Sequence, residues 1–174
     1  MQFNLYDRFL DEIDNVIDLT VNDQHLYQAK RCLLDYLAAT IAGSSISKQK
    51  SKVLLNSLEN ENDQSSTVIG MKSKASTQNA AFINGFNSHK AELDDGVLSG
   101  IIHPGGPIFS ALLPVSEKQK ANGHKFLLGI IAGYEAAVRL SEAIQPSHKK
   151  QGFHASGTCG ALGATLAITK TLSF

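Results

Sequence analysis

The chain has 174 residues, 43% of them hydrophobic, which is enough for one domain with a substantial core. Its 16 basic and 16 acidic side chains balance, which excludes the strongly charged surface of a protein that binds nucleic acid or anionic lipid. No apolar run approaches the roughly 18 residues that span a bilayer. We therefore expect neither a nucleic-acid partner nor a membrane partner.

The first residues lack the basic and apolar regions of a secretory signal peptide. Cys32 and Cys159 lie in apolar, helix-like stretches and follow no metal or redox spacing. This placement indicates buried thiols in a reducing compartment. We therefore expect a cytoplasmic protein.

Apolar residues recur at intervals of three and four along most of the chain, the spacing of helices that bury one face. This spacing predicts helices, in chain order, over residues 4–17, 26–41, 47–59, 76–88, 108–121, 124–144 and 157–172. Residues 59–66 read as a polar loop, and Ser66–Gly70 is the one strand-like run. The sequence therefore predicts an all-α, helical-bundle domain over residues 1–174 with no internal boundary.

Capping residues and helix breakers indicate where several of these helices end. Thr20, Asn22 and Asp23 are candidate N-caps for the second helix, which is expected to stop at Gly43. Pro107 is expected at the first position of the fifth helix. Pro114, further along that helix, is expected to kink it.

The densest group of ionisable residues follows the helix predicted over 76–88. Glu92, Asp94, Asp95 and two histidines, His89 and His103, fall within fifteen positions among helix-breaking glycines and prolines. Ionisable groups on an ordered loop commonly build a catalytic site. Adjacent aspartates cannot both point the same way, so one is expected to act as an acid or base, or to orient a histidine, and the other to brace the loop. The alternative is that these acids only cap the loop through Asx turns.

His103 has its backbone restrained by the neighbouring Ile102 and Pro104, which suits a positioned base. The alternative is a loop histidine that only faces solvent. Gly105 and Gly106 leave their backbone N–H groups unobstructed, and a helix N-terminus there attracts the carboxylate of a ligand.

A second polar island carries the one local excess of positive charge, in His148, Lys149, Lys150 and His154. It can form an anion-binding rim with His154 deeper, or the lysines can be a solvated pair stabilised by a helix C-terminus. The glycine-rich run Gly152–Gly160 lacks the ending of a phosphate-binding P-loop, so close helix packing explains its glycines better.

Through these motifs the sequence resembles the MmgE/PrpD family, which includes 2-methylcitrate dehydratase, cis-aconitate decarboxylase and iminodisuccinate epimerase. The matching pieces run in family order and are Ala29–Ala38, Ala42–Ser44, Ala80–Gly85, His89–Asp95, Ile102–Gly105, Ala132–Glu135, Arg139–Leu140 and Gly152–Gly160. Each piece is modest alone, and their joint order and spacing make the resemblance specific.

The resemblance implies a helical domain with a separate α+β lid domain, usually in a homodimer. It also implies lyase or isomerase chemistry on di- or tricarboxylates without a metal or an organic cofactor. Members of the family are more than twice as long as this chain. The resemblance therefore implies an N-terminal portion that lacks the lid and that associates as a homodimer or with a chain carrying the other half.

Individual residues match the family unevenly. His103 and His154 match its active-site histidines, and Asp94 and Asp95 match its paired acids. Glu92 falls where other members often carry an acid. A departure is Gly96, which stands where dehydratase- and decarboxylase-type members commonly have threonine, so a hydroxyl contact is absent.

These observations support a lyase that acts on a citrate-like di- or tricarboxylate. His103 is expected to transfer the proton, oriented by Asp94 or Asp95, and His154 to bind a carboxylate or share the transfer. The expected substrate-binding residues are Glu92, Gly105 and Lys150. No metal and no cofactor are expected.

Three alternatives stay open. One is carboxylate epimerisation within the same family. Another is a metal-dependent hydrolase built from His103, His154 and an aspartate. The third is an inactive half-length subunit that only oligomerises. Association is also suggested by an apolar face left on the last helix by Leu166, Ile168, Leu172 and Phe174.

Overall fold

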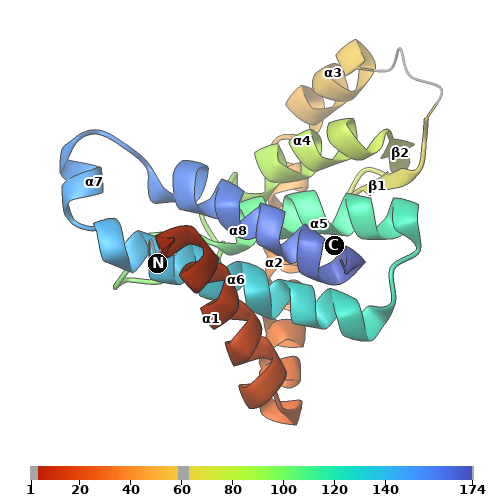
Figure 1. The fold of residues 1–174 in the computed structure, drawn as a ribbon. Coiled ribbons are helices and arrows are strands. Elements are labelled where there is room, and N and C mark those ends of the chain that lie inside the picture. The colour runs from red at the N-terminus through yellow and green to blue at the C-terminus, as the bar shows by residue number, and fades with distance from the viewer. Residues whose placement is uncertain (1–3, 59–62, 174) are drawn as a thin grey trace.

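The computed structural model describes residues 4–58 and 63–173, and it is built almost entirely of helices (Figure 1). The helices are α1 (Leu5–Thr20), α2 (Asp23–Ile46), α3 (Lys48–Leu58), α4 (Thr77–Ser88), α5 (Gly105–Gln119), α6 (Gly123–Ile144), α7 (Ser147–Lys150) and α8 (Ala155–Leu172). A short hairpin pairs β1 (Ser66–Val68) with β2 (Ser73–Ala75) in antiparallel register. The predicted all-α class is confirmed.

Two short elements were not predicted from the sequence, namely α7 and β2. Both are only three or four residues long, which is too short to show a hydrophobic period. Residues 59–62 of the expected polar loop and Phe174 of the expected apolar face lie outside the described residues. Within the described ranges, no helix has the length and apolar character needed to cross a membrane.

The centre of the molecule is the packing of α8 against α5 and α6 (Figure 1). Two glycines let the backbones of α6 and α8 touch. A Cβ on Gly163 would lie 2.6 Å from the carbonyl oxygen of Gly133, and one on Gly133 would lie 2.9 Å from the carbonyl oxygen of Gly163. Any side chain here would push the helices apart. In the glycine-rich run Gly152–Gly160, close packing explains Gly160, where a Cβ would lie 2.5 Å from Pro107 Cγ, but not Gly152 or Gly157, where a Cβ would meet no atom within 4 Å.

An aromatic group ties α2 and α6 to α5. The ring of Phe109, which is fully buried, lies 5.0 Å from the ring of Tyr36 and 6.0 Å from that of Tyr134, measured between centroids. The Tyr36 hydroxyl also hydrogen-bonds Ser110 Oγ over 2.8 Å. This group fixes Tyr134, whose hydroxyl reaches the loop between α4 and α5.

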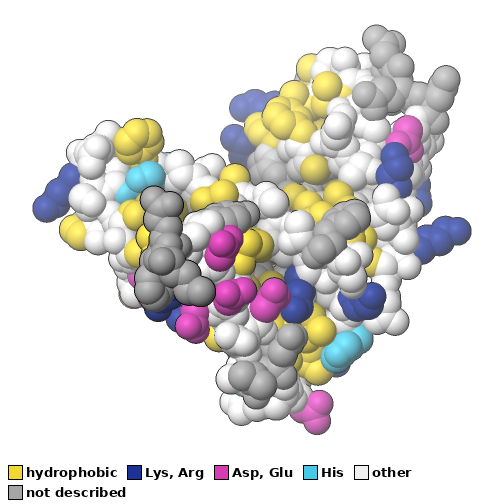
Figure 2. Space-filling view, viewed as in Figure 1, with side chains coloured by type: hydrophobic (Ala, Val, Ile, Leu, Met, Phe, Trp, Pro, Cys, Tyr) yellow, Lys and Arg dark blue, Asp and Glu magenta, His cyan; other side chains and the backbone are white. Residues whose placement is uncertain are grey.

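Helix α1 covers the outer face of α6. Its Ile13 and Ile17 are buried against Ala132 and Ala136. Figure 2 shows acidic side chains gathered over α1 on the exposed side of the molecule. The alternation of apolar and acidic residues in the sequence thus makes α1 an amphipathic cover for the bundle.

Helix α2 corrects one predicted boundary and confirms another. The helix was expected to stop at Gly43 but continues to Ile46. Gly43 lies inside the helix, where the missing side chain allows α4 to approach closely. A Cβ at Gly43 would lie 1.9 Å from the carbonyl oxygen of Asn87. At the other end, Asn22 is the N-cap, and its own N–H donates to His25 Nδ1 over 3.2 Å in a capping box.

Helix α5 begins earlier than predicted. Gly105 is its first residue, so Pro107 lies in the third position of the first turn and not in the first. The helix runs on both sides of Pro114, whose carbonyl accepts a hydrogen bond of 2.9 Å from Ser66 Oγ. The loop that precedes α5 carries most of the candidate functional residues.

Candidate active site

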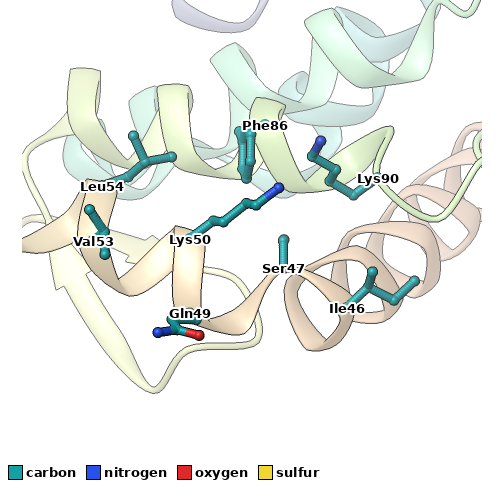
Figure 3. Close-up of a pocket in the computed structure, with 8 residues that line it drawn as sticks. All are labelled: Ile46, Ser47, Gln49, Lys50, Val53, Leu54, Phe86 and Lys90. Atoms are coloured by element: carbon teal, nitrogen blue, oxygen red, sulfur yellow. The ribbon is translucent and has the colours of Figure 1, made fainter.

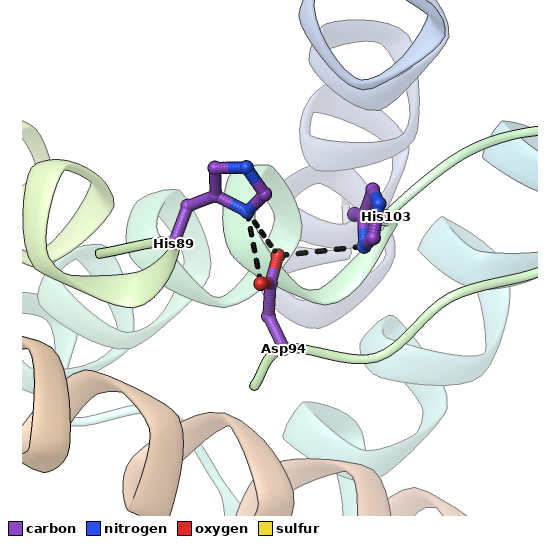
Figure 4. A group of neighbouring side chains, drawn as sticks. All are labelled: His89, Asp94 and His103. Carbon is purple, nitrogen blue, oxygen red and sulfur yellow. Dashed lines mark hydrogen bonds and ion pairs between the residues drawn. The ribbon is translucent and has the colours of Figure 1, made fainter. Parts of the chain in front are cut away.

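Asp94 lies between two histidines (Figure 4). Its side chain is only 4% exposed, and both carboxylate oxygens lie 2.8 Å from Nδ1 of His89, the residue that caps α4. The Nδ1 atom of His103 lies 3.6 Å from Asp94 Oδ2, which is an electrostatic contact and not a hydrogen bond. A carboxylate so enclosed needs a partner for its charge, and the two imidazoles supply it.

His103 is held in one orientation and one tautomer. Its backbone N–H donates to Ser156 Oγ in α8 over 3.0 Å. Its Nδ1 lies 2.6 Å from the backbone carbonyl of Asp95. A carbonyl only accepts, so Nδ1 carries the proton, and in the neutral ring Nε2 keeps its lone pair. His103 therefore has the form of a positioned general base.

The carboxylate of Asp95 braces the loop. Its Oδ1 accepts from the Gly105 N–H over 3.0 Å, and its Oδ2 accepts from the Tyr134 hydroxyl over 2.6 Å. Burial raises the pKa of Asp95, and the two hydrogen bonds oppose that rise. Burial and the nearby Asp95 raise the pKa of Tyr134, so its hydroxyl stays a proton donor. Asp95 thus acts on His103 through its main chain.

His154 has the opposite tautomer. It is the N-cap of α8, where its Nδ1 accepts from the Ser156 N–H over 3.3 Å. The neutral ring therefore carries its proton on Nε2. His103 and His154 line the same hollow of about 370 Å³, together with Gly96, Lys149 and Phe153. One hollow thus receives a histidine with a lone pair and a histidine with an N–H donor.

The three residues expected to bind substrate do not line the hollow together. The Gly105 N–H binds the chain's own Asp95. Lys149 lines the hollow, whereas Lys150, its exposed neighbour, is outside the lining. Glu92 is exposed and is outside the lining of the hollow, with Oε1 3.6 Å from His89 Nε2.

Comparison of the sequence with known proteins identifies the family to which this site belongs. Residues 14–174 match the model of the MmgE/PrpD N-terminal domain. The chain belongs to the MmgE/PrpD family. It is 28% identical over 158 residues to a cis-aconitate decarboxylase-like protein, oryM, of Aspergillus oryzae. That alignment covers 84% of this chain and 32% of the fungal protein, so the chain spans about a third of that relative's length.

In this MmgE/PrpD domain, sequence reasoning missed His89 and Tyr134. His89 stood beside the acidic motif without a role. Only the turn at Glu92, whose φ of 51° lies in the left-handed region, brings Asp94 back to it. Tyr134 lay inside a matching piece of the sequence, but its contact with Asp95 spans 39 positions and depends on how α6 packs. Cys159 is buried as predicted, whereas Cys32 is only partly buried.

A larger hollow of about 920 Å³ opens between α3 and α4 of the MmgE/PrpD domain (Figure 3). Apolar side chains and two lysines line it, and Lys90 Nζ lies 4.8 Å from the ring centre of Phe86. Its lining lacks a carboxylate or imidazole to pair with Lys50 or Lys90. Proton-transfer chemistry therefore favours the hollow of His103 and His154.

The residues able to hold a metal differ from those considered in the sequence. Donor atoms of His89, Asp94 and His103 all lie within 4.8 Å of one another. Within the described residues, His89 takes the place that His154 had in the metal-dependent alternative.

Proposed function

We propose that this domain supplies the acid–base groups of a lyase that acts on a di- or tricarboxylate. The observation that carries the proposal is the pair of opposite tautomers, His103 with a lone pair on Nε2 and His154 with a proton on Nε2, on one hollow. A lyase of this kind needs one group to take a proton and another to give one.

In a dehydration, His103 Nε2 takes the proton from a carbon next to a carboxylate. The C–H electrons form the new double bond, the C–O bond breaks, and His154 in its imidazolium form gives its Nε2 proton to the departing hydroxyl, which leaves as water and returns the ring to neutral. Asp94, whose Oδ2 lies 3.6 Å from His103 Nδ1, stabilises the imidazolium that His103 becomes.

Positive charge for the substrate's carboxylates comes from the α7 region. Lys149 lines the hollow and is the better placed of the two lysines, with Lys150 adding to the local potential. Glu92, which is exposed beside His89, is proposed to accept a hydrogen bond from a hydroxyl of the substrate. The name of the fungal relative agrees with a carboxylate substrate. We also propose that the site is completed by association, either in a homodimer or with a second chain.

The test is ligand-observed proton NMR of the purified chain with citrate, 2-methylcitrate and cis-aconitate in turn. We expect a product signal with at least one of them. His103→Ala is expected to lower the rate by at least about a hundredfold, the usual contribution of an acid–base group. His124→Ala, a change at an exposed histidine in the first turn of α6, is the matched control and is expected to keep the rate. A rate unchanged by His103→Ala contradicts the assignment.

Epimerisation of a dicarboxylate is the second candidate, because a histidine with a lone pair on Nε2 and a histidine with a proton on Nε2 also suit removal of a proton from one face of a carbon and delivery of a proton to the other. The two reactions are separated in D₂O. An epimerase exchanges the carbon-bound proton for deuterium and keeps the substrate's skeleton, whereas a lyase releases water or carbon dioxide.

A further inference from the structure

We propose that His89, Asp94 and His103 form a binding site for one divalent transition-metal ion of the zinc or ferrous type. This proposal goes beyond the lyase assignment and does not depend on it, because the metal-bound state is separate from the state in which His103 transfers a proton. It rests on the geometry of the three side chains (Figure 4), on their types and on the enclosure of the carboxylate.

The distances are close to those that an ion requires. Ligand atoms about 2.1 Å from a zinc ion lie roughly 3–4 Å from one another. Asp94 Oδ2 lies 2.8 Å from His89 Nδ1 and 3.6 Å from His103 Nδ1, and all donor atoms of the group lie within 4.8 Å of one another. Small side-chain rotations therefore bring three donors around a single ion.

The ligand types select the class of ion. Two imidazoles and one carboxylate suit zinc, ferrous iron, cobalt or nickel, whereas magnesium and calcium prefer oxygen ligands. Three protein ligands leave at least one coordination position for water or for the carboxylate of a small molecule. The imidazoles of His89 and His103 are 50% and 43% exposed, so an ion can reach them from solvent.

The charge of Asp94 is the second observation. Only 4% of the Asp94 side chain is exposed. Within the described residues, no lysine or arginine forms an ion pair with it. In the part of the chain that the structure describes, its side-chain partners are the two imidazoles. A divalent ion compensates a buried carboxylate more completely than a neutral imidazole does.

The three ligands are also held in advance. His89 caps α4, and the backbone of His103 is bonded to Ser156 of α8 and followed by Pro104. Coordination through His103 Nδ1 moves the ring proton, which this atom donates to the Asp95 carbonyl, to Nε2, so the metal-bound form lacks the Nε2 lone pair that takes the proton in the proposed lyase step. The carbonyl oxygen then lies within reach as a further oxygen ligand.

The test uses the full chain, stripped with a chelator and dialysed. Titration with Zn²⁺ is followed by calorimetry, and titration with Co²⁺ is followed by its visible absorption, which reports nitrogen and oxygen ligation. We expect one ion per chain. His89→Ala and Asp94→Asn are each expected to weaken binding by at least about tenfold, whereas His124→Ala leaves it unchanged.

His89 is half exposed and asparagine matches the shape of aspartate, and circular dichroism checks that both variants fold. Stoichiometric binding that both variants weaken supports the proposal. Absence of saturable binding overturns it, and so does binding that neither variant weakens. Because the measurement involves no substrate, its failure leaves the lyase assignment to be judged by turnover.

Discussion

The Tyr134 hydroxyl donates to Asp95 Oδ2 over 2.6 Å, and this bond ties α6 to the loop that carries the histidines. Asp95 in turn presents its carbonyl to His103 Nδ1. Tyr134 therefore positions His103 although the two residues do not share a hydrogen bond.

The first prediction concerns this bond. Tyr134→Phe leaves a largely buried carboxylate oxygen without its donor, so we expect the free energy of unfolding to fall by about 1–3 kcal/mol. Urea denaturation measures the change. Tyr27→Phe, which alters a side chain that is 64% exposed, is the matched control and is expected to have no measurable effect. Equal stabilities of the two variants would contradict the bracing role of Tyr134.

A second prediction concerns alkaline pH. Burial raises the pKa of Tyr36 to about 12, and burial raises the pKa of Tyr134 as well. Above about pH 10 the unfolded chain releases these protons while the folded chain keeps them. The unfolded state then binds fewer protons, so stability falls as the pH rises towards 12.

Tyr36→Phe should remove its share of this loss. The stability advantage of the wild type over Tyr36→Phe is expected to shrink between pH 9 and pH 11.5, as measured by urea denaturation at a series of pH values. The loss in Tyr27→Phe should follow the wild type. A constant difference between wild type and Tyr36→Phe across this range would contradict the expected linkage.

A third prediction separates two roles of His154. As N-cap of α8 it contributes to stability, and as an N–H donor on the hollow it is proposed to act in turnover. Asparagine is a good N-cap but a poor acid. We expect His154→Asn to keep the melting temperature and to lower turnover by about a hundredfold or more.

The companion variant His154→Ala is expected to lower turnover to the same extent and also to lower stability by about 0.5–2 kcal/mol. Thermal unfolding and the NMR assay are measured on both variants. If His154→Asn retains full turnover, His154 is only a helix cap.

Much of this fold could be predicted from the sequence, because the helices are long and amphipathic. The boundary at Gly43 failed because a glycine that allows close helix contact and a glycine that ends a helix look the same in a sequence. The site was found only in part. The pairing of His89 with Asp94 depends on a left-handed turn at Glu92. Glutamate rarely adopts this conformation, so the sequence does not predict the turn.

The α6–α8 contact gives a fourth prediction. A Cβ on Gly163 would lie 2.6 Å from the Gly133 carbonyl oxygen and 2.8 Å from the Ala137 Cβ, so Gly163→Ala forces the helices apart. We expect a loss of about 1–3 kcal/mol in urea denaturation. Gly157→Ala in the same helix meets no atom within 4 Å and should be neutral or stabilise by up to about 1 kcal/mol. The reverse order of stabilities would contradict the close packing of these helices.

The last prediction concerns Gly96, beside His103. A Cβ built on Gly96 lies 3.6 Å from His103 Cε1, which is ordinary van der Waals contact, so Gly96→Thr is expected to fold normally. Its hydroxyl adds a hydrogen-bonding group at the edge of the hollow that Gly96 and His103 line. For a substrate that the chain turns over, we expect Gly96→Thr to lower KM by up to about tenfold, the effect of one hydrogen bond. Gly96→Ala adds the Cβ without the hydroxyl and is the control. If both variants change KM equally, the effect is one of shape, and the hydroxyl has no partner in the substrate.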